Sequence, residues 1–581
     1  MELLRGFADS AILGLADIHV AQRLCALARE PDETVALAIG LLVAALRSGS
    51  VCLDLQLVAK QHEQAGAADA AWPEPGAWLA AVRASPLTGD PPVLRILSDS
   101  KADLLYLDRY WLEEQQVCSD VLARLRKADA AEPLPDLERL FPAEFSEQRA
   151  AAEVALAQRL TILTGGPGTG KTTTVARLLA SIAEQADLTG SAAPRMALAA
   201  PTGKAAARLA EAVTLEVGKL PQIDRQRLAG LRATTLHRLL GSRPDTSSRF
   251  RHHRDNRLPH DVVVVDETSM VSLTMMARLL EAVRPDARLL LVGDPDQLAS
   301  VDAGAVLADL VDGLGDGLAD GRADGRADDR SDGGVVELKT SHRFGESIGS
   351  LAQAIRAGDT DLAVALLGAR DESVEWIDSA DPAEQLRAHL VEHALGLREA
   401  ALLGDAEAAL TILNGHRLLC AHRHGPFGVT RWNRQVERWL ADKTGRSVWS
   451  QWYAGRPILV TANDYGLGIY NGDTGVAVAS PDGVRAHIGS LHLATSRLPE
   501  VDTMHAMTIH KSQGSQADEV TVLLPPPESR LLTRELFYTA VTRAKTKVRV
   551  VGPESSVRAA ITRRALRASG LARRLRQLSP P

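Results

Sequence analysis

The stretch TILTGGPGTGKTTTVARLL, residues 161–179, decides the fold. Its first four residues have the composition of a short buried β-strand, and the residues after Lys171 have the spacing of an α-helix. The glycine-rich loop between them, residues 165–170, can turn its backbone N–H groups inward around phosphates at the positive end of that helix. This strand–loop–helix order is the context of a Walker A motif, and it predicts a nucleotide site in an α/β domain.

The loop supplies most of the predicted nucleotide contacts. Lys171 can reach the β- and γ-phosphates of ATP, and the hydroxyl of Thr172 can ligate Mg²⁺. We expect the nucleotide to lie against Gly165, Gly166, Pro167, Gly168, Thr169, Gly170, Lys171 and Thr172.

A second acidic motif, DVVVVDETSM, occupies residues 261–270. Four consecutive valines are typical of a strand buried on both faces, in the middle of a parallel sheet. Asp266 at the end of this strand is placed to hold Mg²⁺, and Glu267 is the natural base to orient an attacking water. Alone, such a pair is usually a loop carboxylate or a helix cap, but beside a Walker A motif the catalytic interpretation is favoured.

The remaining sequence indicates four regions. Residues 1–125 are rich in Ala and Leu at helical spacing and predict a helical N-terminal domain, followed by a Pro- and acid-rich linker at 126–144. Residues 145–345 and 346–581 alternate strands with helices, which predicts two α/β domains with parallel sheets. A block of short β-like segments at about 452–502 predicts a small β-rich insertion in the second domain.

Two segments have an unusual composition. Residues 312–334 are a low-complexity run of Asp and Gly, which we expect to form a surface loop without a core. Residues 551–581 carry seven arginines and one glutamate. This tail is either a surface that faces phosphates or a partner, or the solvated end of an amphipathic helix.

Charge and cysteine content limit the class of protein. The net charge of −7 does not indicate a nucleic-acid binder, but a motor needs only a basic channel. The four cysteines are scattered without paired spacing, which favours reduced thiols over a zinc site or disulfides. No apolar run is long enough to span a bilayer. We expect a cytoplasmic protein.

Further motifs follow the Walker A loop in the order found in superfamily 1 DNA helicases. They are APTGKAAARL (200–209), TLHRLLG (235–241), GDPDQLASV (293–301), LKTSHRF (338–344), MTIHKSQGSQADEV (507–520) and YTAVTRAK (538–545). Together with CAHRHGPFGVTRWN (420–433) and NDYGLGIYNGDTGV (463–476), they resemble the RecD family within that superfamily. The resemblance covers roughly residues 145–550 and implies two RecA-like P-loop domains.

The resemblance also implies roles for individual residues. Gln148 would read the adenine, Gln297 would connect the γ-phosphate to the DNA channel, and Arg343 and Arg543 would contact the γ-phosphate. Arg343 lies at the end of the first α/β domain and Arg543 in the second, and an arginine fork can stabilise charge on a transferring phosphoryl group. The expected DNA contacts are Thr202, Lys204, His237, Asn463, His510 and Lys511.

If the resemblance holds, the protein translocates 5′→3′ on single-stranded DNA drawn from duplex ends, using ATP and Mg²⁺. Its N-terminal domain would dock on a RecC-like subunit, and a RecB-like subunit would carry the nuclease, because no nuclease motif is visible in this chain. Two alternatives remain. One is a stand-alone RecD-like helicase, and the other is a nucleotide-dependent module that binds DNA without translocating.

Overall fold

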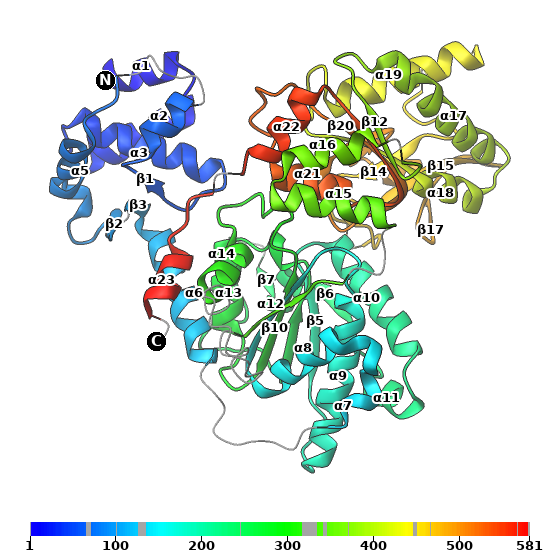
Figure 1. Ribbon diagram of the computed structural model, residues 1–581, viewed down its shortest axis with the longest axis horizontal. Helices are drawn as coiled ribbons and strands as arrows, with labels where there is room; N and C mark the ends of the chain where they lie inside the picture. The colour runs from blue at the N-terminus through cyan, green and yellow to red at the C-terminus, as the bar shows by residue number, and fades with distance from the viewer. Residues whose placement is uncertain are drawn as a thin grey trace.

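The computed structural model describes residues 2–64, 71–99, 102–125, 135–243, 246–315, 334–340, 345–369, 371–445, 450–464, 466–565 and 567–578. An N-terminal region and two α/β domains are arranged as three separate masses, and the end of the chain returns to the first two (Figure 1). Among these residues, none of the helices combines the length and the apolar character needed to cross a bilayer.

The N-terminal region is mainly helical but also contains an antiparallel sheet that the sequence analysis did not predict. The sheet order is β1-β3-β2. These strands have only two to five residues and are rich in Leu, not in β-branched residues, which makes them hard to recognise. The elements are α1 (Glu2–Asp9), α2 (Leu15–Ala28), α3 (Glu33–Arg47), β1 (Leu53–Asp54), α4 (Val58–Gln64), α5 (Pro75–Ala84), β2 (Leu94–Ser98), β3 (Asp103–Leu107) and α6 (Asp108–Leu125).

The first α/β domain is built on a six-stranded parallel sheet of order β11-β4-β10-β9-β5-β6. Its strands are β4 (Leu160–Gly165), β5 (Met196–Ala200), β6 (Ala233–Thr235), β9 (Val262–Val265), β10 (Arg288–Gly293) and β11 (Val335–Leu338). The main helices are α8 (Ser146–Ala157), α9 (Lys171–Leu188), α10 (Gly203–Gly218), α13 (Leu273–Ala282) and α14 (Val306–Gly315). Alternate valines of β9 enter two different hydrophobic cores, one on each face of the sheet, as the four-valine run predicts.

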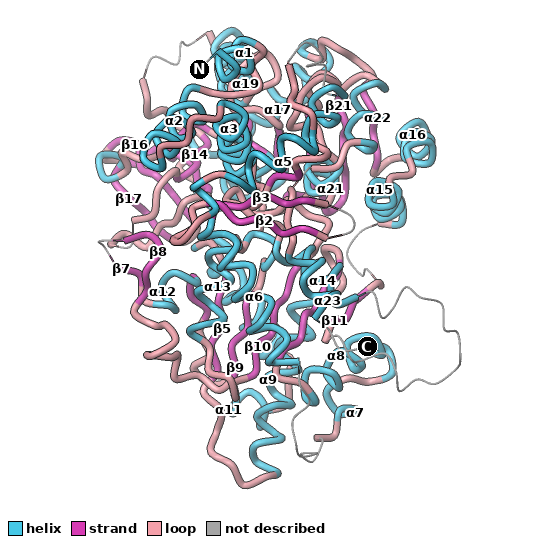
Figure 2. Tube along the Cα trace, turned by 90° about the vertical axis from the view of Figure 1, so that its left-hand side faces the viewer, coloured by secondary structure: helices cyan, strands magenta, loops and turns pink. Residues whose placement is uncertain are grey.

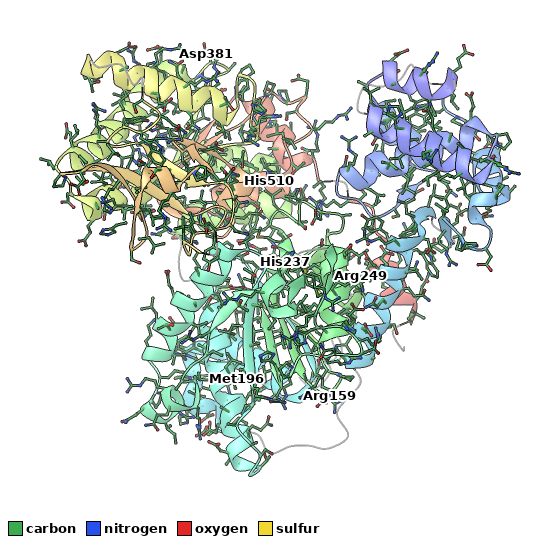
Figure 3. The ribbon with its side chains drawn as sticks, turned by 180° about the vertical axis from the view of Figure 1, so that it is seen from behind. Arg159, Met196, His237, Arg249, Asp381 and His510 are labelled. Atoms are coloured by element: carbon green, nitrogen blue, oxygen red, sulfur yellow. The ribbon has the colours of Figure 1, made fainter. Side chains whose placement is uncertain are left out.

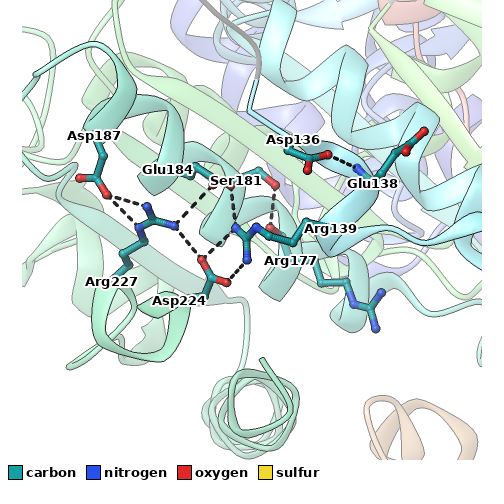
Figure 4. Close-up of polar contacts among 9 residues, drawn as sticks. All are labelled: Asp136, Glu138, Arg139, Arg177, Ser181, Glu184, Asp187, Asp224 and Arg227. Carbon is teal, nitrogen blue, oxygen red and sulfur yellow. Dashed lines mark hydrogen bonds and ion pairs between the residues drawn. The ribbon is translucent and has the colours of Figure 1, made fainter. Parts of the chain in front are cut away.

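Shorter elements complete this domain: α7 (Leu137–Leu140), α11 (Gln222–Arg227), α12 (Leu236–Leu240), β7 (Ser242–Arg243) and β8 (Thr246–Phe250). An ion-pair cluster joins α7, α9 and α11 (Figure 4). In it, fully buried Asp224 accepts hydrogen bonds from both Arg139 and Arg227. Its charge is therefore compensated within the fold, so this cluster is structural.

The second α/β domain has a five-stranded parallel sheet of order β12-β21-β20-β13-β19. Its strands are β12 (Val374–Ile377), β13 (His416–Cys420), β19 (Ala506–Thr508), β20 (Ala517–Leu523) and β21 (Ala544–Val551). Its helices are α15 (Glu346–Ala357), α16 (Thr360–Gly368), α17 (Ala383–Leu402), α18 (Ala406–Gly415), α19 (Val429–Thr444), α20 (Ile509–Ser512), α21 (Arg534–Val541) and α22 (Glu554–Thr562).

The predicted β-rich insertion is present as an antiparallel sheet of order β17-β16-β15-β14-β18. It consists of β14 (Pro457–Val460), β15 (Thr474–Ser480), β16 (Gly483–Ile488), β17 (Leu491–Ala494) and β18 (Val501–Thr503). The two parallel sheets with this insertion confirm the predicted α/β fold class.

Part of the arginine-rich C-terminus packs against the rest of the chain, which the sequence analysis did not predict. After α22 the chain returns to the first domain, where α23 (Leu571–Leu578) packs on α14 and α6 (Figures 1 and 2). Leu571 and Leu575 are fully buried there. Buried Glu114 of α6 accepts hydrogen bonds from the Gly570 N–H at 2.9 Å and from Arg574 Nε at 3.2 Å. The segment therefore joins the N-terminal region to the first domain.

Candidate nucleotide site and DNA-facing surface

Many of the predicted functional residues lie at the carboxyl ends of strands in the two parallel sheets. The exceptions are Gln148 in α8, Asn463 in the antiparallel insertion and Arg543, which precedes β21. In Figure 3, His237, which follows β6, and His510, which follows β19, lie where the two α/β domains face each other. Arg159 and Met196, at the beginnings of β4 and β5, lie at the opposite end of the first domain. The carboxyl ends of the strands, where His237 and His510 lie, form the edge at which α/β proteins bind their ligands.

The loop between β4 and α9 has the backbone that phosphate binding requires. Gly168 and Gly170 have φ values of 86° and 84°, which residues with a side chain rarely adopt. Lys171 Nζ donates hydrogen bonds to the carbonyls of the first two loop glycines, at 2.6 and 2.9 Å. The ammonium group is therefore held over the loop, at the N-terminus of an 18-residue helix.

Gln148 and Glu147 of α8 lie beside this loop. Gln148 is buried, and its Nε2 lies 3.5 Å from the carbonyl oxygen of Thr169. Burial acts to raise the pKa of Glu147, but hydrogen bonds to its carboxylate from the Thr340 hydroxyl and from the backbone N–H groups of Thr340 and Lys339 lower it overall. The segment after β11 is thus anchored at the nucleotide site. Arg343, predicted as a γ-phosphate contact, lies outside the described residues.

The acidic pair follows β9, separated from β4 by β10. The pKa of Asp266 is raised to about 6, mainly by burial and in addition by the neighbouring Glu267, while Lys171 acts in the opposite direction. Glu267 has a φ of 52°, an uncommon backbone conformation for a residue with a side chain. A divalent cation beside this carboxyl group would favour its ionised form.

These residues fit Mg²⁺ bound together with a nucleotide. The described residues contain no cluster of three or more His, Cys, Asp or Glu side chains that could hold a metal by itself. Mg²⁺ is commonly held by one or two carboxylates together with substrate phosphates. Asp266 and the hydroxyl of Thr172, in the first turn of α9, are the side chains that would complete its coordination.

A hydrogen-bonded chain crosses from the first domain to the second beside this site. Asp294 follows β10, and its Oδ2 accepts a hydrogen bond from Gln297 Nε2 at 2.9 Å. Gln297 Oε1 in turn accepts a hydrogen bond from Arg543 Nη2 of the second domain at 2.7 Å. All three side chains are buried. Arg543 is therefore positioned through Gln297, which links two residues that the sequence analysis had assigned separately.

Tyr538 makes a second link across the same junction, and the sequence analysis did not single it out. Its hydroxyl donates to Asp294 Oδ2 at 3.1 Å. A Cβ atom built on Gly166 would lie 3.1 Å from that hydroxyl, so the tyrosine also contacts the phosphate-binding loop. Tyr538 is the first residue of the motif YTAVTRAK, and only the arginine of this motif was assigned a role from the sequence. Its role becomes visible only when the two domains are seen together.

Two of the predicted DNA-contact residues lie at the start of α10. Thr202 Oγ1 caps this helix by accepting a hydrogen bond from the Ala205 N–H. Lys204 is half-buried, and its Nζ donates to the carbonyl of Gly472 in the β14–β15 loop at 2.8 Å. In the same loop, Asn463 accepts a hydrogen bond from the Asn471 N–H at 2.9 Å. The insertion therefore lies against the first domain at this point.

The other predicted DNA contacts come from both domains. His237 lies in α12 with its ring centroid 5.8 Å from that of Phe250. His510 and Lys511 lie in α20, and burial lowers the pKa of both. Each of these residues follows a strand of a parallel sheet at its carboxyl end, as Thr202 and Lys204 do.

Family models match three parts of the chain. Residues 9–98 match the N-terminal domain of RecBCD enzyme subunit RecD, residues 148–303 match an AAA domain, and residues 503–551 match a UvrD-like helicase C-terminal domain.

Several proteins are similar over most of the chain. RecBCD enzyme subunit RecD of Mycolicibacterium smegmatis is 68% identical and covers 99% of both chains. The protein of the same name from Mycobacterium tuberculosis is 64% identical over 99% of this chain and 96% of its own. ATP-dependent RecD2 DNA helicase of Deinococcus radiodurans is 32% identical over 74% of this chain and 52% of its own. Among solved structures, Bacteroides Pif1 bound to single-stranded DNA covers 70% of this chain and 91% of its own, with 17% identity and a TM-score of 0.37.

Proposed function

This chain belongs to the RecD family of RecBCD enzyme subunits, and on that basis we propose that it translocates 5′→3′ on single-stranded DNA, using ATP and Mg²⁺. As a member of this family it is an ATP-dependent DNA helicase. We place its work in double-strand break repair, recombination and the degradation of linear DNA, as one subunit of a heterotrimer.

Each nucleotide-site residue has a part in this proposal. Lys171 neutralises charge on the phosphates, Glu267 orients the attacking water, and Arg543 and Arg343 stabilise the transferring phosphoryl group. Thr172 and Asp266 would hold Mg²⁺, which would offset the charge of the phosphates. Gln148 lies beside the loop that would hold the nucleotide.

The partners follow from the names of the relatives. We propose that a RecB-like subunit supplies the nuclease and that a RecC-like subunit binds the N-terminal region. A cytoplasmic location agrees with the four cysteines, which are all buried as free thiols. The stand-alone helicase remains the alternative, because RecD2 of Deinococcus radiodurans is also similar to this chain.

The observation that carries the proposal is the buried chain Asp294–Gln297–Arg543, because it connects the nucleotide edge of one domain to the other. A nucleotide that changes this contact changes how the two domains meet. Because each domain carries predicted DNA contacts, one set of DNA contacts then moves relative to the other. The proposed direction is tested by unwinding of duplexes that carry either a 5′ or a 3′ single-stranded tail.

We expect unwinding of the 5′-tailed duplex alone, and its loss in the Lys171→Gln variant. Unwinding of the 3′-tailed duplex would contradict the direction. Binding of DNA without any unwinding, by the chain and by its complex with the partner subunits, would favour the non-translocating module.

A further inference from the structure

The loop that carries Gln297 is held by several parts of the chain. It covers residues 294–305, between β10 and α14, and has no regular secondary structure. Because such a loop loses conformational entropy when it is ordered, contacts from outside it must hold it in one conformation. Gln297 joins Asp294 to Arg543, so the groups that fix this loop also position residues of the nucleotide site.

The second domain fixes the backbone beside Gln297. The Leu298 N–H donates to Thr539 Oγ1 at 2.9 Å, and the Leu298 carbonyl accepts a hydrogen bond from Gln513 Nε2 at 2.8 Å. The carbonyl of Thr539 also accepts a hydrogen bond from Arg543 Nε at 3.0 Å. One side of the loop is therefore held at the junction of the two α/β domains.

A different group fixes the loop farther along. Arg567, in the segment after α22, donates from Nη1 to the Ser300 carbonyl. The Ser300 N–H donates to the Ser269 carbonyl of the acidic motif at 3.1 Å. Ser300 is therefore held by both of its backbone groups. It lies three positions after Gln297, so at most about 11 Å separates their Cα atoms.

The N-terminal region provides the surface on which Arg567 lies. The loop after α3 contains Gly49, and a Cβ atom there would lie 2.9 Å from Arg567 Cζ and Nη1. The guanidinium group is therefore in close contact with the backbone of Gly49, which has a φ of 92°. The Gly49 carbonyl also accepts a hydrogen bond from the Gly304 N–H at 2.9 Å. The N-terminal region thus contacts the 294–305 loop directly as well as through Arg567.

Hydrogen bonds of the next residue keep Arg567 in this place. The Val51 N–H donates to the Ala568 carbonyl at 2.8 Å, and the Ala568 N–H donates to Ser50 Oγ at 3.1 Å. The segment after α22 is therefore attached to the N-terminal region where it passes from the second domain towards α23 (Figure 1). Burial lowers the pKa of Arg567, and the carboxylate of Glu535 in α21 partly offsets this effect.

Two roles fit an arginine at this place. Arg567 is close enough to His510, a predicted DNA contact, to lower the pKa of that histidine in addition to the larger effect of burial. A direct contact with a DNA phosphate is therefore one role, and support of the 294–305 loop is the other. The hydrogen bond to the Ser300 carbonyl favours the second role.

We propose that Arg567 is a positioning residue for ATP hydrolysis. By holding the Ser300 carbonyl, it keeps Gln297 in contact with Arg543. Through Gly49, the N-terminal region takes part in this positioning. The inference rests on the proposed function, because that function gives Arg543 its part in hydrolysis.

The test is steady-state ATP hydrolysis by the full-length chain and by its complex with the partner subunits, with single-stranded DNA titrated to saturation. We expect Arg567→Ala to lower kcat about five- to tenfold. The half-saturating DNA concentration and the temperature of thermal unfolding should stay unchanged. Arg567→Lys keeps a charged donor and should recover most of the rate. Arg564→Ala is the control, because Arg564 is exposed in the same segment, and it should behave like the wild type.

A second variant tests the place of Gly49. Gly49→Ala brings a methyl group against the guanidinium group and should lower kcat as Arg567→Ala does. In the double variant it should lower kcat no further, because both substitutions act on one contact. Gly483→Ala is the matched control: Gly483 has a φ of 108°, but a Cβ atom there would meet no other atom within 4 Å.

Wild-type kcat in Arg567→Ala, beside a clear loss in Gln297→Ala, would overturn the inference and leave the proposed function standing. A raised half-saturating DNA concentration with unchanged kcat would also overturn it, because Arg567 would then contact DNA directly. So would equal losses of rate and thermal stability without recovery in Arg567→Lys, which indicate a purely structural role. Wild-type kcat in Gln297→Ala would instead contradict the part that the proposed function gives to the Asp294–Gln297–Arg543 chain, so the two failures are distinguishable.

Discussion

Among single residues, Tyr538 is the clearest link between the two domains, because its hydroxyl donates to Asp294 and lies against Gly166 of the phosphate-binding loop. Replacing it by Phe removes one hydrogen bond to a buried carboxylate and leaves the packing of the ring in place. A hydrogen bond to a charged group contributes roughly 1.5–3 kcal/mol. We expect Tyr538→Phe to lower the DNA-stimulated rate of ATP hydrolysis about tenfold, with folding unchanged, as measured by steady-state kinetics and circular dichroism.

Tyr453→Phe is the control for this prediction. Tyr453 is also in the second domain, and its hydroxyl lies 3.2 Å from Glu437 Oε1 and from His505 Nε2, away from the nucleotide residues. If both variants lose the same activity, Tyr538 acts only through the stability of its domain. The coupling role predicted for Tyr538 would then be wrong.

At the scale of elements, the contact between α10 and the β14–β15 loop decides how the predicted DNA surface opens. Lys204 Nζ is held by the Gly472 carbonyl, and a Cβ atom on Gly203 would lie 2.4 Å from the Tyr470 ring. The loop therefore covers a residue that we expect to contact DNA. Binding of DNA to Lys204 requires this loop to move.

This contact predicts a pH dependence. The pKa of Lys204 is lowered to about 7, mainly by burial and in addition by the charges of Arg208 and Arg417. Once exposed, the amine returns towards its ordinary pKa near 10.4. Between these values the covered lysine is neutral and the exposed lysine is charged, so opening takes up a proton. Opening therefore becomes easier as the pH falls from about 10 to about 7, and changes no further below that.

Calorimetric titration with single-stranded DNA at pH 8, in buffers of different ionisation enthalpy, measures this proton. On binding DNA, the wild type should take up nearly one proton more per molecule than the Lys204→Met variant does. Equal proton uptake in the two proteins would show that Lys204 remains covered when DNA is bound.

At the scale of the whole molecule, α23 ties the N-terminal region to the first domain. Arg574 and Glu114 form a buried ion pair, with side chains 10% and 0% exposed. Removing one partner of such a pair leaves a buried charge and typically costs about 3–5 kcal/mol. We expect Arg574→Ala to lower the free energy of unfolding by about 3 kcal/mol in urea titrations and to speed proteolysis between α6 and α8.

Arg576→Ala is the matched control on the same helix. Arg576 pairs with Asp312 at 2.7 Å, but both side chains are more than a third exposed. Such surface pairs contribute about 0–1 kcal/mol. Equal and small effects of the two substitutions would mean that α23 does not hold the regions together.

The sequence predicted what local patterns encode. The Walker A loop, the valine strand and the β-rich insertion each lie within one short segment, and the structure places them as expected. The sequence did not predict contacts between segments that are far apart in the chain. The return of α23 to α6 joins residues about 460 positions apart, and the cover over Lys204 comes from 268 residues away. Neither contact produces a periodic pattern of residues in the sequence from which it could be predicted.

The central claim is that ATP hydrolysis at Lys171 drives movement along DNA. The most direct measurement is the ATP hydrolysis rate of the purified chain with and without single-stranded DNA, beside Lys171→Gln, and then with the partner subunits. We expect strong stimulation by DNA that is absent in Lys171→Gln. Hydrolysis that is indifferent to DNA in both the isolated chain and the complex would contradict it.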